Sequence, residues 1–173
     1  NDQVLSIRTT MHATAQNKLY AEIGEKPCLA EEIGTMGPSV CSEERAADFL
    51  RVNMFSLWAN GAGGVMWWCA HDQTELESNP YSYQMVEREL GMLYNDRTPK
   101  PVLVEMKEFS SWIDKLDFKL PAAQTDAVCL LTRDQNHWGV AYMTHILCKK
   151  VGLNCKFAFL RLNRGPFGKL ICL

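Results

Sequence analysis

The sequence has almost no excess of charge and no long hydrophobic run. Its 173 residues carry 18 basic and 20 acidic side chains, for a formal net charge of −2. Nucleic-acid-binding proteins concentrate basic residues on one face, so this balance predicts no DNA or RNA partner. The longest apolar run, 63–70, is far shorter than the roughly 18 residues of a membrane-spanning helix. We therefore expect neither a nucleic acid nor a membrane as partner.

The sequence also lacks the patterns of metal, redox and nucleotide sites. None of its seven cysteines forms a CxxC pair, and the loop at 132–138 has no Gly-x-Gly-x-x-Gly motif. We therefore predict no metal site and no cofactor. An odd number of unpaired cysteines slightly favours a reducing, cytoplasmic compartment. Because Asn1 is neither an initiator methionine nor the start of a signal peptide, we expect the true N-terminus to lie upstream, and the localisation stays unknown.

The first half of the chain alternates helical and strand-like patterns. We predict a helix within 4–23, a strand at 26–34, a helix capped by Ser42, and a second strand at 65–70. The apolar stripe of the capped helix consists of Ala46, Phe49, Leu50, Met54, Leu57 and Trp58. Two strands joined by a helix pair in parallel, which indicates an α/β fold.

Two carboxylates stand at the end of the first predicted strand. Strict alternation places Glu32 on the face of Cys28 and Ala30, and Glu31 on the opposite face. The two carboxylates are therefore expected to point in opposite directions.

The second half of the chain repeats the strand, helix, strand order after a long connection. The elements expected there are a short helix within 86–93, a helix from Pro101 to Leu116, a linker at 121–125, a strand at 127–131, a helix at 139–151 and a strand at 155–160. The last three form a βαβ unit, and residues 161–173 show no clear periodicity.

Three segments, in order, are similar to the end of a retaining glycosidase barrel. Residues 26–34, Lys-Pro-Cys-Leu-Ala-Glu-Glu-Ile-Gly, resemble the seventh strand of family five glycoside hydrolases. Residues 64–68, Gly-Val-Met-Trp-Trp, resemble the eighth strand, and residues 90–101 resemble the stretch that leads into the last barrel helix. This resemblance covers about two thirds of the chain. It implies a partial (β/α)8, or TIM, barrel at 1–120, since a complete barrel needs roughly 250 residues.

The resemblance assigns roles to five residues. Glu32 matches the catalytic nucleophile, and Trp68 matches the indole on which a sugar ring stacks. The loop residues His71, Asp72 and Gln73 follow the eighth strand, where substrate contacts would lie. Ordinary alternatives remain for each of them. A Glu at a strand end is more often a surface carboxylate, Trp67 and Trp68 could both pack in a core, and the loop could serve a capping box.

The sequence departs from the family at the general acid/base, which is usually preceded by Asn. No Asn-Glu pair occurs in the chain, so half of the catalytic pair would lie upstream. Residues 121–173 resemble the start of an amidotransferase-like or flavodoxin-like α/β domain. We predict a fragment of a retaining β-glycosidase that acts on an oligo- or polysaccharide of β-linked sugars, β-mannan or β-glucan. The alternative is a non-catalytic carbohydrate-binding or interaction protein on a barrel scaffold. Open strand edges also make association into a homo-oligomer an expectation.

Overall fold

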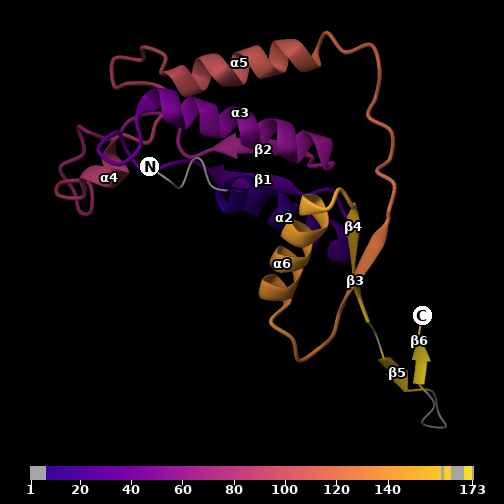
Figure 1. Ribbon diagram of the computed structural model, residues 1–173. Helices are drawn as coiled ribbons and strands as arrows, with labels where there is room; N and C mark the ends of the chain where they lie inside the picture. Colours follow the sequence, from indigo (N-terminus) through magenta and orange to yellow (C-terminus); the bar gives the residue numbers. More distant parts are fainter. Residues whose placement is uncertain (1–6, 161, 165–169, 173) are drawn as a thin grey trace.

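The computed structural model describes residues 7–160, 162–164 and 170–172, in which helices alternate with short strands (Figure 1). In chain order, the elements are α2 (Ile7–Gly24), β1 (Leu29–Ile33), α3 (Glu43–Ala59), β2 (Gly64–Trp67), α4 (Met85–Arg88), α5 (Pro101–Ile113), β3 (Ala127–Leu131), α6 (His137–Lys150), β4 (Cys155–Phe159), β5 (Leu162–Arg164) and β6 (Leu170–Cys172). None of the described helices is long and apolar enough to span a membrane. The chain is a mixed α/β protein, as the alternating patterns predict.

The first half of the chain folds around a parallel pair of strands, β1 and β2. Leu29 pairs with Gly64 and Ala30 with Val65, and α3 is the helical crossover that a parallel pair requires. Figure 1 shows α3 beside the strand pair, with α5 running along α3. The predicted strand, helix, strand order is confirmed here.

Helix α3 begins and packs as its sequence predicts. Ser42 is the N-cap, and its side chain accepts a hydrogen bond from Arg45 N at 3.4 Å. Glu43 and Glu44 occupy the first turn, where carboxylates interact favourably with the helix dipole. Five of the six residues of the predicted stripe are buried; the sixth, Trp58, is half-buried and meets Trp112 of α5 edge-on at 5.1 Å.

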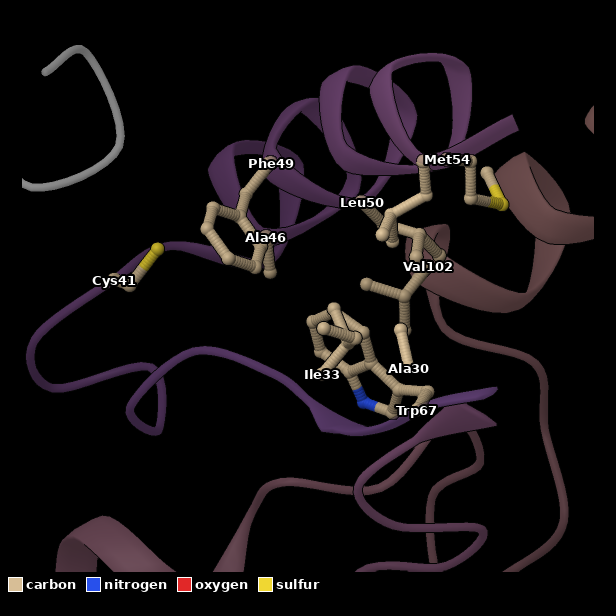
Figure 2. Close-up of a cluster of buried hydrophobic side chains, with 10 residues drawn as sticks. Ala30, Ile33, Cys41, Ala46, Phe49, Leu50, Met54, Trp67 and Val102 are labelled. Carbon is tan, nitrogen blue, oxygen red and sulfur yellow. The ribbon is translucent and has the colours of Figure 1, made fainter. Parts of the chain in front are cut away.

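A cluster of buried side chains fills the space between α3 and the strand pair. Ala30 and Ile33 of β1 and Trp67 of β2 lie opposite Leu50 of α3, and Val102 of α5 closes the cluster (Figure 2). Leu50 is fully buried, and burial of a leucine side chain contributes about 1.5–3 kcal/mol to folding. This core attaches α3 and α5 to one face of the two strands.

Strand β1 departs from strict alternation. Ala30 and Ile33 both enter the same core, although they are three residues apart, and Glu31 and Glu32 between them are both exposed. The register of β1 against β2 shifts in this interval, and Glu32 has a left-handed backbone with φ of 52°. Such an irregularity adds one residue between two buried positions. The prediction that Glu31 and Glu32 face opposite sides of a regular strand is therefore wrong.

The second half of the chain contains a βαβ unit. Strands β3 and β4 pair in parallel from Ala127 with Cys155 to Leu131 with Phe159, and α6 connects them. Asn136 caps α6, and its side chain accepts a hydrogen bond from Gly139 N at 3.0 Å. The predicted order of elements is confirmed, and residues 121–126 before β3 have no regular structure.

Helix α2 contacts both halves. Leu19 is 4% exposed and packs in one core cluster with Leu131 and Phe157 of the βαβ unit. The side chain of Glu22 accepts a hydrogen bond from the backbone N–H of Phe157 at 2.6 Å. The residues after the linker are therefore packed directly against a helix from the start of the chain.

Several predicted elements differ in extent from those of the structure. The strand expected at 65–70 ends at Trp67, the helix expected within 86–93 is the single turn α4, and the helix expected to reach Leu116 ends at Ile113. Of the C-terminal residues without a predicted structure, β5 and β6 form an antiparallel pair. Residues 161, 165–169 and 173 lie outside the described part of the chain. One βαβ unit does not distinguish a flavodoxin-like domain from other parallel sheets, so that prediction stays open.

Candidate active site

Glu32 lies at the carboxyl end of β1, where parallel α/β folds place catalytic groups. Its side chain and that of Glu31 are both exposed, because the irregular backbone at this point turns both away from the core. Gly34 follows, and a side chain here would approach the carbonyl oxygen of Trp68 to 3.1 Å. The end of β1 is therefore closely apposed to the residues that follow β2.

Trp67, the last residue of β2, and Trp68, which follows it, have different environments. Trp67 is 8% exposed, and its indole N–H donates to the carbonyl of Leu90 at 2.9 Å. Trp68 is 45% exposed, and its backbone N–H donates to the carbonyl of Ile33 at 2.9 Å. Of the two tryptophans that could pack in a core, Trp67 does so and Trp68 does not. Trp68 follows Trp67, which pairs with Ile33, the residue after Glu32. Contact of the exposed Trp68 with a sugar stays a prediction.

The three predicted loop residues have different positions. His71 is exposed, and Gln73 is half-buried with its backbone N–H donating to the carbonyl of Arg88 at 2.7 Å. The side chain of Asp72 is only 5% exposed. Its Oδ1 accepts hydrogen bonds from Lys100 Nζ at 2.8 Å and from Gly91 N at 2.9 Å. Asp72 is thus engaged inside the protein, whereas His71 is open to solvent.

Lys100 is a buried cation that sequence reasoning did not identify. It is 3% exposed and lies 3.4 Å from Glu43 Oε1 as well as 2.8 Å from Asp72. Tyr94 donates a hydrogen bond to Glu43, and this bond, together with burial, raises the pKa of Tyr94 to about 12. The network ties the loop after β2 to the starts of α3 and α5. One sign of it was present in the sequence, because a lysine just before a helix N-terminus is electrostatically unfavourable unless carboxylates hold it.

A depression of about 620 Å³ adjoins the end of β1. Both Glu31 and Glu32 line it, together with side chains from three helices. The helical residues are His12, Ala13 and Gln16 of α2, Phe49 and Asn53 of α3, and Trp138 and Tyr142 of α6. Sequence reasoning left Trp138, Tyr142 and Asn53 unassigned. No local pattern could have placed α6 here, since more than a hundred residues separate it from β1.

The arrangement provides a solvent-accessible carboxylate, an exposed indole and a polar depression. A retaining glycosidase requires a carboxylate nucleophile and a second carboxyl group about 5–5.5 Å away that protonates the leaving oxygen. Glu32 could act as the first of these. In the described part of the chain, no group of three or more His, Cys, Asp or Glu residues is arranged to hold a metal ion.

Comparison with solved structures identifies similar folds, whereas no protein-family model and no curated protein sequence matches the chain. A GH5_18 enzyme variant from Streptomyces cattleya, in complex with Manb1-4GlcNAc, aligns with a TM-score of 0.69 and 21% identity over 90% of this chain. A second GH5_18 variant, from Bifidobacterium longum subsp. longum and in complex with the same ligand, has a TM-score of 0.70 and 18% identity over 89% of the chain. The exo-beta-1,4-mannosidase Op5Man5 from Opitutaceae bacterium strain TAV5 has a TM-score of 0.68 and 19% identity over 88% of the chain.

The chain spans only part of each of these structures: 40%, 38% and 28% of their respective lengths. The alignment covers 90% of this chain, which is more residues than the segment 1–120 contains. Part of the βαβ unit within 121–173 is therefore aligned as well. These neighbours are barrel enzymes of glycoside hydrolase family 5. The chain therefore has the fold of one part of a family 5 glycoside hydrolase structure.

Proposed function

We propose that the chain is part of a retaining glycosidase that hydrolyses β-linked oligo- or polysaccharides, and that β-mannosides are its substrates. The observation that carries the proposal is the position of Glu32, exposed at the carboxyl end of β1, a parallel strand. Its neighbour Ile33 accepts a hydrogen bond from the backbone N–H of Trp68, which is itself exposed. The fold likeness supports it, because two of the similar structures contain Manb1-4GlcNAc and a third is described as a mannosidase.

In this proposal Glu32 attacks the anomeric carbon and forms a covalent glycosyl-enzyme. A second carboxyl group, outside this chain, protonates the leaving oxygen and then deprotonates the water that releases the sugar. Trp68 stacks against the apolar C–H face of the ring, while His71 and Gln73 hydrogen-bond its hydroxyls. Asp72 was also predicted to bind substrate. In this proposal its ion pair with Lys100 also fixes the position of the loop after β2.

Substitution of Glu32 in the full-length protein tests the assignment. Glu32→Gln should lower kcat on an aryl β-mannoside by about 10⁴-fold or more, because the side chain forms a bond in the reaction. The matched control is Glu31→Gln, at the adjacent exposed carboxylate, which should change kcat by less than about tenfold.

A fluorinated-sugar inactivator should label Glu32, and azide should restore turnover to Glu32→Ala with a product of inverted configuration.

Two results would contradict this assignment. Labelling of Glu31 would mean that the neighbouring carboxylate is the nucleophile. A first-formed product of inverted configuration from the wild-type protein would mean that the mechanism is not a double displacement. Binding of the glycan without any turnover would favour the alternative, a non-catalytic carbohydrate-binding protein on the same scaffold.

We also propose that residues 121–173 begin a separate flavodoxin-like α/β domain. The parallel pairing of β3 and β4 through α6 supports this. The irregular, exposed linker at 121–126 supports a boundary close to residue 120.

A further inference from the structure

We infer that Lys100 is a positioning residue for Trp68, the tryptophan that follows β2. Lys100 acts through the segment 89–93, which we call the brace, because this segment is hydrogen-bonded to the residues on either side of Trp68. The inference rests on the proposed function and deepens it. It adds a buried residue that touches no sugar to those on which the reaction depends.

The brace holds both neighbours of Trp68 with a single carbonyl group. The carbonyl of Leu90 accepts a hydrogen bond from the indole N–H of Trp67 at 2.9 Å and another from the backbone N–H of Cys69 at 3.2 Å. The backbone N–H of Trp68 donates to the carbonyl of Ile33 in β1 at 2.9 Å. The backbone at Trp68 is therefore fixed by β1 and by the brace together.

The pairing with the brace continues beyond Trp68. The backbone N–H of Met92 donates to the carbonyl of Cys69 at 3.0 Å, and that of Leu93 donates to the carbonyl of Ala70 at 3.1 Å. The carbonyl of Leu93 in turn accepts a hydrogen bond from the backbone N–H of Asp72 at 2.9 Å. A displacement of the brace would therefore move the backbone that carries the indole of Trp68.

Lys100 holds the brace at three points. Its Nζ donates to the carbonyl of Glu89 at 3.1 Å, and its backbone N–H donates to the carbonyl of Met92 at 2.9 Å. Its Nζ also donates to Asp72 Oδ1 at 2.8 Å, and the same oxygen accepts a hydrogen bond from Gly91 N at 2.9 Å. Lys100 thus fixes the brace on both sides of Gly91 and, through Asp72, at Gly91 itself.

The close packing of the brace leaves it little room to move. A Cβ atom at Gly91 would lie 2.3 Å from the backbone at His71 and Asp72. Lys100 and the side chain of Asp72 are 3% and 5% exposed, so their contacts are enclosed by this chain itself. Apolar side chains often stabilise a core as well as a buried ion pair does. An ammonium group, however, can bond the Glu89 carbonyl and Asp72 at once, which favours a role in geometry.

A double-mutant cycle in the full-length protein tests the inference. Lys100→Met should lower kcat/KM on an aryl β-mannoside by about 10- to 100-fold, because a shift of about 1 Å in a substrate-positioning group can cost this much. Trp68→Ala should lower kcat/KM at least as much. In the Trp68→Ala background, Lys100→Met should lower kcat/KM by less than about threefold further, because the effects of two residues that act as a unit are not additive.

Two variants separate positioning from a general loss of stability. Leu57→Ala truncates a side chain that is 1% exposed near the end of α3. This change also destabilises the core, but kcat/KM should fall by less than about threefold because no substrate-positioning group moves. Gly91→Ala displaces the brace without removing a charge. It should behave as Lys100→Met does, and it takes the place of Lys100→Met in the cycle if that variant does not fold.

A spectroscopic readout is independent of turnover. In protein labelled with fluorotryptophan, the ¹⁹F NMR resonance of Trp68 is identified by its loss in Trp68→Phe. This resonance should shift or broaden in Lys100→Met. The resonance of Trp138, which lies in α6, should stay unchanged and serves as the internal control.

Three results would overturn the inference. Multiplicative effects of Lys100→Met and Trp68→Ala would mean that the two residues act independently. An equal loss of kcat/KM in Leu57→Ala would mean that activity follows stability alone, and an unchanged Trp68 resonance in Lys100→Met would mean that the indole has not moved. In each case the proposed function would stand if Glu32 still proved essential for turnover. If the wild-type protein hydrolyses no β-linked glycan, the proposed function fails, and the ¹⁹F spectrum alone decides whether Lys100 positions Trp68.

Discussion

Replacement of Lys100 by methionine should destabilise the fold, because it leaves a buried carboxylate without its cation. Lys100 and the side chain of Asp72 are 3% and 5% exposed, and their charged atoms are 2.8 Å apart. Removal of one partner of a buried ion pair costs roughly 3–5 kcal/mol. Asp72 would keep the hydrogen bond from Gly91 N, and Glu43 would keep that from Tyr94. We therefore expect the lower end of this range, about 3 kcal/mol.

Urea denaturation measures this loss. A change of about 3 kcal/mol should lower the midpoint by about 1.5 M, since m is about 2 kcal/mol/M for a small protein. The double variant Lys100→Met with Asp72→Asn should recover most of the loss, because no charge then remains unpaired at 5% exposure. Lys107→Met, at an exposed position of α5, should change stability by less than about 0.5 kcal/mol. A loss below about 1 kcal/mol for Lys100→Met, or a double variant as unstable as the sum of the two single variants, would refute the argument.

Two further predictions concern stability. Burial, and then the nearby cations of Lys149 and Lys18, lower the pKa of His145 from 6.5 to about 4. Because the folded state disfavours the protonated ring, the contribution of His145 to stability should be constant above pH 6.5 and should fall by about 1.4 kcal/mol per pH unit towards pH 4. Urea midpoints at pH 7 and pH 5 should therefore differ less in His145→Leu than in the wild-type protein. Equal differences in both proteins would contradict this. Gly91→Ala should cost about 3 kcal/mol, because a Cβ atom there would lie 2.3 Å from the backbone at His71 and Asp72. The control Gly24→Ala meets nothing within 4 Å and should be nearly neutral in the same assay, and similar effects at the two glycines would show that the loop can shift freely.

The local elements of this fold could be predicted because their signals lie within a few residues. Ser42 and the two glutamates after it define the start of α3, and apolar spacing identifies the face that packs on the strands. The βαβ unit was found in the same way, from two short apolar runs around a helical pattern.

The details of the candidate site could not be predicted, because they depend on contacts between distant residues and on an unusual backbone. Nothing in the composition of 26–34 indicates that Glu32 has a positive φ, which most residues adopt rarely. The pairing of Asp72 with Lys100 joins residues 28 positions apart, and the approach of Trp138 to Glu32 depends on how α6 docks onto α2. Local periodicity carries no information on such contacts.

The hydrogen bond from Phe157 to Glu22 determines how the sheet of the second unit can grow. The backbone N–H of Phe157 points away from β3, and a carboxylate from α2 already occupies it. A side chain in this place blocks the outer edge of β4 against pairing with a further strand, in the manner of devices that protect sheet edges from aggregation. Among the described strands of this sheet, the edge of β3 is therefore the one open to elongation. An added strand would place β3 in the interior of the sheet and keep β4 as its border against α2.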